Sequence, residues 1–285
     1  MRRLLLLDGA TGTELNRRGV DTGLPIWSAN ALTTDTGLNV LRQIHLDYLN
    51  AGADILTANT FRTHRRALAG KGHPARELTR RAVATAQEAV AEFGQPAQVA
   101  GSVAPLEDCY RPDLVPSDDE CRAEHSERID HLVEAGVDLL LIETMNTIRE
   151  AVIAAKLATK TGRTTLVSFV CDREGRILSG ESLSVAAGLL LQLGVKALGV
   201  NCGPAHTLAK PLAELRAMCG PDFPLIAYGN IGYADEEQGW INTDAVNPDS
   251  YLQYARTWSA QIVGGCCGTA PEHIRKLRVG RKLTT

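Results

Sequence analysis

Several features that would assign a protein to a specialised class are missing from this sequence. No apolar run approaches the roughly 20 residues that a membrane-spanning helix requires. The four leucines that follow Met1-Arg2-Arg3 are too short an apolar core for an export signal. The seven cysteines are an odd number without a secretory context, which indicates a reducing compartment. We therefore expect a cytoplasmic protein that does not enter a membrane.

Neither sign of charge dominates. The chain has 30 Lys and Arg against 33 Asp and Glu, with a net charge of -3 and a pI near 6.2, so we expect no general attraction to nucleic acid or to an anionic membrane. No Pro- or Ser-rich linker and no charge run divides the 285 residues, whose 44% hydrophobic content supports a large core. The sequence predicts one domain over residues 1–285 with small-molecule partners, and it leaves the oligomeric state open.

Short apolar runs alternate with helical patterns eight times along the chain. The apolar runs are typical of buried parallel strands, and 3.6-residue periodicity followed by glycine stops marks the helices. Eight strand–helix units predict an α/β protein, a (β/α)8 TIM barrel. The expected strands are Leu4–Asp8, Asp54–Asn59, Gln98–Val103, Asp138–Glu143, Thr165–Val170, Ala197–Cys202, Leu225–Gly229 and Gln261–Gly265. The expected helices are Leu38–Asn50, Glu77–Phe93, Asp118–Glu134, Thr147–Lys160, Ser184–Leu193, His206–Met218, Pro248–Ser259 and Pro271–Arg278.

Three long connections, residues 20–36, 110–119 and 231–247, follow the first, third and seventh expected strands. In a barrel such inserts overhang the face that carries the active site. Two similar junctions, Ala51–Asp54 and Ala135–Asp138, join a helix to the next strand at the opposite end of the barrel. We expect these junctions to contribute to stability only.

Two adjacent cysteines, Cys266 and Cys267, follow an apolar strand between glycines, and Cys202 ends another apolar run. The glycines allow a sharp turn, so that the sulfurs of both strand ends can meet at one point. Three thiolates at about 2.3 Å are a protein ligand set for zinc that keeps a fourth position open. A redox pair or inert packing would fit the same local pattern, and no CxxC spacing is present to distinguish these alternatives from a metal site.

Acidic side chains follow two other strands. Asp8 ends the first expected strand and Glu143 the fourth, and in a barrel both ends project toward the active face. A buried carboxylate is costly unless it meets a cation or hydrogen-bond donors. The ammonium group of a substrate would provide both, whereas capping of the following helix is the alternative role.

The residues after the first strand do not form a phosphate loop, because Thr11–Glu14 lacks both the GxGxxG spacing and a GK[ST] ending. Gly9 is instead expected to let the backbone approach a substrate carboxylate closely. Three aromatic residues, Trp27, Tyr228 and Trp240, lie in or beside the long inserts. Their ring faces are suited either to holding a cationic ligand or to ordinary packing.

Together these motifs resemble the homocysteine S-methyltransferase family of zinc-thiolate barrels. The resemblance runs from Leu5–Ala10 to Gly264–Pro271, and the double cysteine with an upstream Asn-Cys is its most specific part. It implies that Cys202, Cys266 and Cys267 bind zinc. It further implies that Asp8, Gly9 and Glu143 hold the amino-acid portion of homocysteine and that Asn201 supports the zinc site.

The resemblance also bears on the methyl donor. The betaine-using branch has a tyrosine after the acid of strand four, where this chain has Thr144, and the segment around Trp27 is similar to the branch that uses sulfonium donors. We therefore expect transfer of a methyl group to the homocysteine thiolate from S-methylmethionine, then S-adenosylmethionine, with betaine third. A corrinoid protein as the methyl source and a zinc-binding barrel without catalysis are the alternatives.

Overall fold

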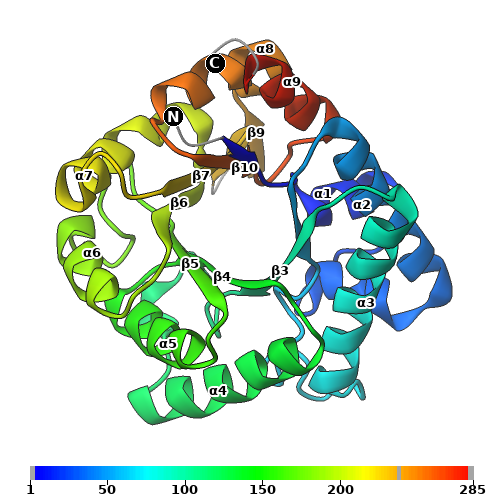
Figure 1. Cartoon of the computed structure of the whole chain (residues 1–285). Helices are drawn as coiled ribbons and strands as arrows, with labels where there is room; N and C mark the ends of the chain where they lie inside the picture. The colour runs from blue at the N-terminus through cyan, green and yellow to red at the C-terminus, as the bar shows by residue number, and fades with distance from the viewer. Residues whose placement is uncertain (1–3, 236–238, 282–285) are drawn as a thin grey trace.

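The computed structural model describes residues 4–235 and 239–281 of the chain. Eight parallel strands form a ring that is surrounded by helices (Figure 1). The prediction of a (β/α)8 TIM barrel is therefore confirmed. The barrel strands are β1 (Leu5–Leu6), β2 (Ile55–Ala58), β3 (Gln98–Val103), β4 (Leu139–Met145), β5 (Thr164–Phe169), β6 (Ala197–Pro204), β7 (Leu225–Asn230) and β10 (Ile262–Gly265).

The strands are hydrogen-bonded in the order β1-β10-β7-β6-β5-β4-β3-β2. The two ends of this order, β1 and β2, are joined by backbone hydrogen bonds. Asp8 N–H donates to the carbonyl of Ile55 at 3.0 Å, and Asp54 N–H donates to the carbonyl of Leu6 at 2.8 Å. The barrel is thus closed, and the carboxyl ends of all eight strands surround one opening.

The helices agree with the sequence expectation to within a few residues, and the structure adds several short elements that the sequence did not predict. The segment after β1 forms a short helix, the insert after β7 forms a hairpin of β8 (Gly232–Asp235) and β9 (Gly239–Asn242), and residues 205–207 form a 3-10 turn before α7. The α-helices are α1 (Thr11–Arg17), α2 (Asp35–Ala51), α3 (Ala75–Phe93), α4 (Asp118–Glu134), α5 (Ile148–Lys160), α6 (Leu183–Gln192), α7 (Ala209–Cys219), α8 (Pro248–Thr257) and α9 (Pro271–Arg281). The 3-10 helices are η1 (Trp27–Thr33), η2 (Pro112–Leu114), η3 (Ala205–Thr207) and η4 (Asp244–Val246).

Local capping explains why several helices begin where they do. The hydroxyl of Thr34 accepts the N–H of Gly37 at the start of α2, and Ser117 forms a reciprocal capping box with Glu120 at the start of α4. Among the described residues, none of these helices has both the length and the apolar character needed to cross a bilayer.

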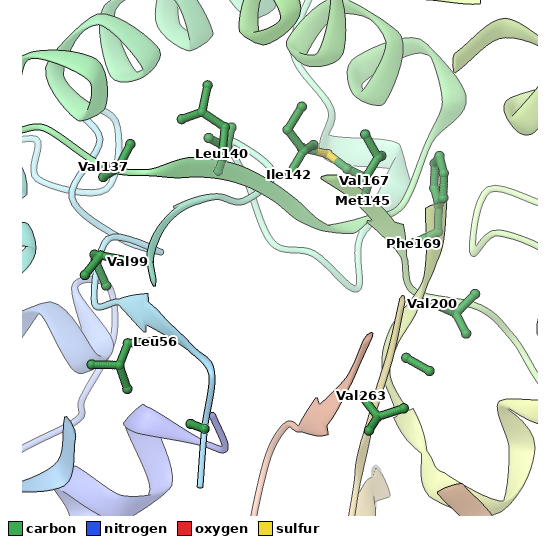
Figure 2. Packing of buried hydrophobic residues seen from close by; sticks show 14 of the residues in the cluster. Leu56, Val99, Val137, Leu140, Ile142, Met145, Val167, Phe169, Val200 and Val263 are labelled. Atoms are coloured by element: carbon green, nitrogen blue, oxygen red, sulfur yellow. The ribbon is translucent and has the colours of Figure 1, made fainter. Parts of the chain in front are cut away.

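Two separate apolar clusters hold the barrel together. The larger lies between the strands and the helices, and Figure 2 shows part of it, including Leu140 and Val167 on the helix side of their strands. The smaller fills the inside of the barrel, as expected for this fold. Its buried members come from every barrel strand or the residue directly after it: Leu7, Ile55, Ala100, Leu139, Leu141, Leu166, Ala197, Ile226, Tyr228 and Ile262.

The two similar helix–strand junctions make the same contact. Asp54 accepts the backbone N–H of Leu6 at 2.9 Å, and Asp138 accepts the backbone N–H of Val99 at 2.7 Å. Each carboxylate therefore ties the start of its own strand to the preceding strand. This contact is at the end of the barrel opposite the opening, in keeping with a structural role.

Candidate metal centre and substrate cavity

Two strands bring three sulfur atoms together at the opening. Cys202 lies in β6, and Cys266 and Cys267 directly follow β10, with β7 between these strands in the barrel. The sulfur of Cys266 is 3.3 Å from that of Cys202, which is 3.9 Å from the sulfur of Cys267. All three sulfurs lie within 4.8 Å of one another, and all seven cysteines of the chain are free thiols.

Bulges in two strands shape this part of the opening. The register of β4 shifts between Ile142 and Met145, and that of β6 shifts between Asn201 and Pro204. Thr144 and Cys202, within these irregular segments, have φ of 58° and 60°. A left-handed backbone is rare for residues other than glycine, above all for a β-branched threonine, and such residues concentrate at functional sites.

Asn201 holds the left-handed segment of β4 in place. Its Oδ1 accepts the N–H of Thr144 at 2.9 Å and the hydroxyl of Ser168 at 2.8 Å, while its Nδ2 donates to the hydroxyl of Thr144 at 2.7 Å. The side chain of Asn201 therefore contacts β4 and β5. Support of a metal by Asn201, through the adjacent Cys202, stays a prediction.

Asn230, at the end of β7, is a positioning residue that our sequence analysis missed. Its Nδ2 donates to the carbonyl of Cys202 at 2.7 Å, and its Oδ1 accepts the N–H of Cys267 at 3.0 Å. One buried amide thus links the two cysteine-bearing segments across β7. The rule that polar groups at strand ends face the opening applies to Asn230 equally and would have identified it.

The three cysteines fit a zinc ion. Thiolates bound to one tetrahedral zinc at about 2.3 Å lie about 3.8 Å from one another, close to the 3.3 and 3.9 Å separations here. Hydrogen bonds from Cys202 and Cys266 hold the pKa of the Cys267 thiol well below its usual range, whereas the shared hydrogen bonds and burial raise the pKa of Cys266. Full ionisation of this crowded set requires a neighbouring cation, and soft thiolates favour zinc among the common divalent metals.

A cavity of about 320 Å³ lies over the cysteines at the carboxyl ends of the strands. Its walls come from strand ends and from the long inserts after β1, β2 and β3. The residues that matter for its chemistry are Asp8, Gly9, Trp27, Thr57, Phe61, Arg62, Ser102, Asp108, Tyr110, Glu143, Thr144, Cys202, Tyr228, Cys266 and Cys267. Eight of the nine residues that we assigned to metal or substrate from the sequence line this cavity, and Asn201 is the exception.

Two buried carboxylates line this cavity. Asp8 accepts the N–H of Thr57 at 2.8 Å and its hydroxyl at 2.9 Å. Glu143 accepts the hydroxyl of Tyr228 at 3.0 Å and the hydroxyl of Ser102. Neither carboxylate forms an ion pair within residues 4–235 and 239–281, although both side chains are less than a tenth exposed.

Burial raises the pKa of Asp8 to about 8 and that of Glu143 to about 7. The charge of Glu143 adds to the shift of Asp8, while hydrogen bonds to both carboxylates oppose the shifts. A cation that entered the cavity would reverse these shifts, because it would replace the lost solvation of the charged forms. The two acids are therefore suited to an ammonium group.

Aromatic residues form the wall nearest the first insert. The ring of Trp27 packs edge-on against Phe61, with centroids 5.8 Å apart, and a Cβ on Gly12 would lie 2.2 Å from the indole. Trp240 lies on β9, is 44% exposed and does not line the cavity. A Cβ on Gly9 would meet Tyr48 at 2.8 Å, so close packing already requires this glycine. Contact of Gly9 with a substrate stays a prediction.

Tyr110 reaches the cysteines from the insert after β3. Its hydroxyl lies 3.2 Å from the sulfur of Cys202 and 3.4 Å from the carbonyl of the same residue. The sequence placed Tyr110 at the start of an overhanging insert but gave no reason to connect it with the sulfurs. Only the path of the folded loop makes this contact.

The opening of the barrel thus combines three converging cysteines, which can hold a metal ion, with two buried acids in the wall of one cavity. The chain belongs to the homocysteine S-methyltransferase family, whose sequence model matches residues 5–279. It is therefore a methyltransferase, as the resemblance of its motifs indicated.

Individual relatives agree with this family over nearly the whole chain. Homocysteine S-methyltransferase YbgG of Bacillus subtilis is 32% identical, over 99% of this chain and 96% of that protein. Selenocysteine Se-methyltransferase of Brassica oleracea is 28% identical, over 95% and 87%. The crystal structure of the metallated form of the homocysteine methyltransferase MmuM from Escherichia coli has a TM-score of 0.83 at 30% identity, covering 98% of this chain and 96% of that one.

Proposed function

We propose that this protein is a zinc-dependent enzyme that transfers a methyl group from a sulfonium compound to the sulfur of L-homocysteine, which yields methionine. The observation that carries the proposal is the convergence of three cysteine sulfurs within 4.8 Å in the wall of a cavity that also holds two buried acids. In this proposal the whole chain serves as one homocysteine-binding domain.

Cys202, Cys266 and Cys267 would hold the zinc ion. Zinc held there would supply the chemistry that lowers the pKa of a bound thiol, which would keep homocysteine as the thiolate at neutral pH. Asn230 fixes the relative position of the two cysteine-bearing segments through its two hydrogen bonds. Asn201 and Thr144 keep the neighbouring end of β4 in its left-handed conformation.

Asp8 and Glu143 would bind the ammonium group of homocysteine. Their hydrogen bonds to Thr57, Ser102 and Tyr228 orient the carboxylates and leave them without a charged partner. The homocysteine sulfur forms the new S–CH3 bond as the S–CH3 bond of the sulfonium breaks, and the electron pair of that bond stays on the donor sulfur. Opposite charges are lost in this step, so it is favoured in a cavity that excludes water.

A sulfonium donor is favoured over betaine by the residues around the cavity. The ring of Trp27 in the cavity wall would suit either cation, whereas Thr144, where the betaine-using branch has a tyrosine, favours the sulfonium. S-methylmethionine is our first choice of donor and S-adenosylmethionine the second. A methylated corrinoid protein or betaine as donor, and a zinc-binding barrel without catalysis, are the competing proposals.

The deciding experiment combines zinc-loaded protein with homocysteine and each donor in turn, and measures methionine. We expect rapid formation from S-methylmethionine, slower formation from S-adenosylmethionine and little from betaine. Methionine from betaine alone, or only from a methylated corrinoid protein, would refute the proposed donor. Absence of product with every donor would favour the non-catalytic alternative. Selenocysteine, which the name of one relative includes, is the informative second acceptor.

A further inference from the structure

Three arginines occupy the loop between β2 and α3, and two of them are paired. Arg65 lies 3.0 Å from a carboxylate oxygen of Glu127, and Arg66 lies 2.6 Å from one of Glu124. In residues 4–235 and 239–281, Arg62 has neither a hydrogen bond nor an ion pair, and its Nε atom is buried without a partner. Of the three guanidinium groups in this loop, that of Arg62 is therefore free to bind a ligand.

Arg62 lines the substrate cavity. No other Lys, Arg or His among the described residues contributes to the cavity wall, whereas three acids do. The guanidinium carbon lies 5.8 Å from the ring centroid of Phe61, which in turn packs against Trp27. Trp27, Phe61 and Arg62 therefore form one continuous wall, which we call the aromatic–arginine wall.

The charge of Arg62 matches a group that every amino-acid substrate carries. A partly buried guanidinium without a partner is costly, and a carboxylate can offset that cost through two parallel hydrogen bonds. Asp8 and Glu143 offer the complementary acids for ammonium groups. Among the described residues of the cavity wall, Arg62 is the cation that can pair with a carboxylate.

The position of Arg62 favours the methyl donor over the acceptor. Asp8 and Glu143 lie at or directly beside strand ends, with exposures of 3% and 7%, and so lie deep in the opening. Arg62 lies four residues beyond the end of β2, in an overhanging loop, on the side of Trp27. An amino-acid donor whose sulfonium contacts Trp27 can therefore reach Arg62 with its carboxylate, because both residues belong to the aromatic–arginine wall.

We propose that Arg62 binds the carboxylate of an amino-acid sulfonium donor and thereby selects such donors over sulfonium compounds without a carboxylate. This inference rests on the proposed function and adds a specificity-determining residue to it. S-methylmethionine and S-adenosylmethionine share the carboxylate, so the inference holds for both. Their relative use is decided by the assay of methionine formation.

The test compares S-methylmethionine with its carboxamide, which keeps the sulfonium and the ammonium but lacks the negative charge. The variants are Arg62→Met, Arg62→Lys and the matched control Arg65→Met, whose side chain pairs outside the cavity wall. We expect the wild type to bind S-methylmethionine at least tenfold more tightly than the carboxamide. Arg62→Met should abolish this preference, Arg62→Lys should keep part of it, and Arg65→Met should keep all of it.

Binding is measured by calorimetry on zinc-loaded protein, in parallel with the KM values for donor and homocysteine. An unchanged preference in Arg62→Met would overturn the proposal, as would a rise in the homocysteine KM without a change in the donor KM. If no donor gives methionine, the proposed function fails, but the calorimetric preference still decides the role of Arg62. Lack of S-methylmethionine binding by the wild-type protein would also refute the proposed role of Arg62.

Discussion

At the scale of the residue, Cys202, Cys266 and Cys267 are the cysteines whose sulfurs lie within 4.8 Å of one another among the described residues. We expect Cys202→Ala, Cys266→Ala and Cys267→Ala to lose nearly all bound zinc and activity, because removal of one thiolate leaves an incomplete ligand set. Metal analysis of purified protein measures this effect. Cys219→Ala is the control, because Cys219 lies at the end of α7 outside the cluster and should retain one zinc per chain. Stoichiometric zinc in Cys267→Ala would exclude the three-sulfur site.

Glu143 offers a test of substrate recognition that is separate from the metal. Glu143→Gln should weaken binding of the amino-acid substrate by about 2 kcal/mol, the scale of a lost charge-assisted contact, and leave zinc content unchanged. Because burial raises the pKa of Glu143 to about 7, binding by the wild type should weaken as the pH falls below 7. The product L-methionine has the same ammonium group and no thiol, so its affinity measured against pH isolates this effect. Glu143→Gln should lose the part of this dependence near pH 7 and keep the part near pH 8 that Asp8 causes. An unchanged dependence near pH 7 would show that Glu143 is not responsible.

Asp8 should reduce the stability of the substrate-free protein at neutral pH. Its pKa is raised from 3.8 to about 8, so the folded state favours the protonated form. Below pH 3.8 Asp8 is protonated in both the folded and the unfolded state and causes no loss of stability. As the pH rises from 3.8 through 8, the unfolded state ionises first, and the folded protein loses stability relative to it. We therefore expect metal-free Asp8→Asn to be more stable than the wild type at pH 8, by about 1 kcal/mol or more.

Thermal unfolding at pH 8 and pH 5 measures the effect of Asp8→Asn. The stability difference between variant and wild type should narrow at the lower pH, where Asp8 is protonated. If Asp8 binds the substrate ammonium as proposed, the variant should at the same time bind homocysteine more weakly, which would explain why a destabilising acid is retained. A less stable variant at pH 8 would contradict our account of the burial of Asp8.

At the scale of the element, α1 packs closely against η1 because residue 12 is a glycine and has no side chain. A Cβ on Gly12 would lie 2.2 Å from the Trp27 indole, so Gly12→Ala must displace that ring. If Trp27 holds the donor cation, the displacement forfeits roughly 0.5–2 kcal/mol. The donor KM should then rise about 2- to 30-fold, with little change in the homocysteine KM or zinc content.

Steady-state kinetics with varied donor and varied homocysteine separates these effects, and Trp27→Leu should give the same pattern. Gly188→Ala in α6 is a suitable control, because its new Cβ would make an ordinary contact of 3.5 Å with Met218. That control should slightly stabilise the protein, since alanine favours a helix more than glycine does. An unchanged donor KM in Gly12→Ala would remove Trp27 from the donor site.

At the scale of the whole molecule, the barrel should remain folded without its metal. Two apolar clusters, one inside the strands and one outside them, are formed without any metal contact. A metal present at a thousandfold excess over its Kd adds about 4 kcal/mol of stability to a folded protein. We expect a chelator to lower the Tm by several degrees and to leave the far-ultraviolet circular dichroism at 25 °C unchanged.

The cysteine variants provide the control for this experiment. Added zinc should not raise the Tm of Cys202→Ala, whereas it should restore the Tm of chelated wild type. Loss of the circular dichroism signal on chelation would mean that the metal is required for folding. The stability of the folded barrel would then depend on the metal-bound cysteine segments, and the two apolar clusters would not be sufficient to keep it folded.

The sequence by itself determined the barrel and the face on which the site is built. Strand and helix periodicities are local properties, and eight repeats of the same unit allow few other architectures. Because parallel strands end on one face, Asp8, Glu143, Cys202 and Cys266 were predictable as neighbours despite their separation in the chain. The helix α1 and the hairpin β8–β9 were missed, because short elements are stabilised by packing against the barrel more than by local preference.

Only the tertiary structure decided which polar groups meet which partners. The barrel order places Asn230 at the opening, but its hydrogen bonds to Cys202 and Cys267 depend on the irregular end of β6 and on the turn after β10, which local pattern does not encode. Arg62 and Arg65 are alike in sequence, yet one lines the cavity and the other pairs with a helix, since the path of their loop sets the direction of each side chain. Residue types thus specify the chemistry that is available, and the contacts between distant segments select where it is used.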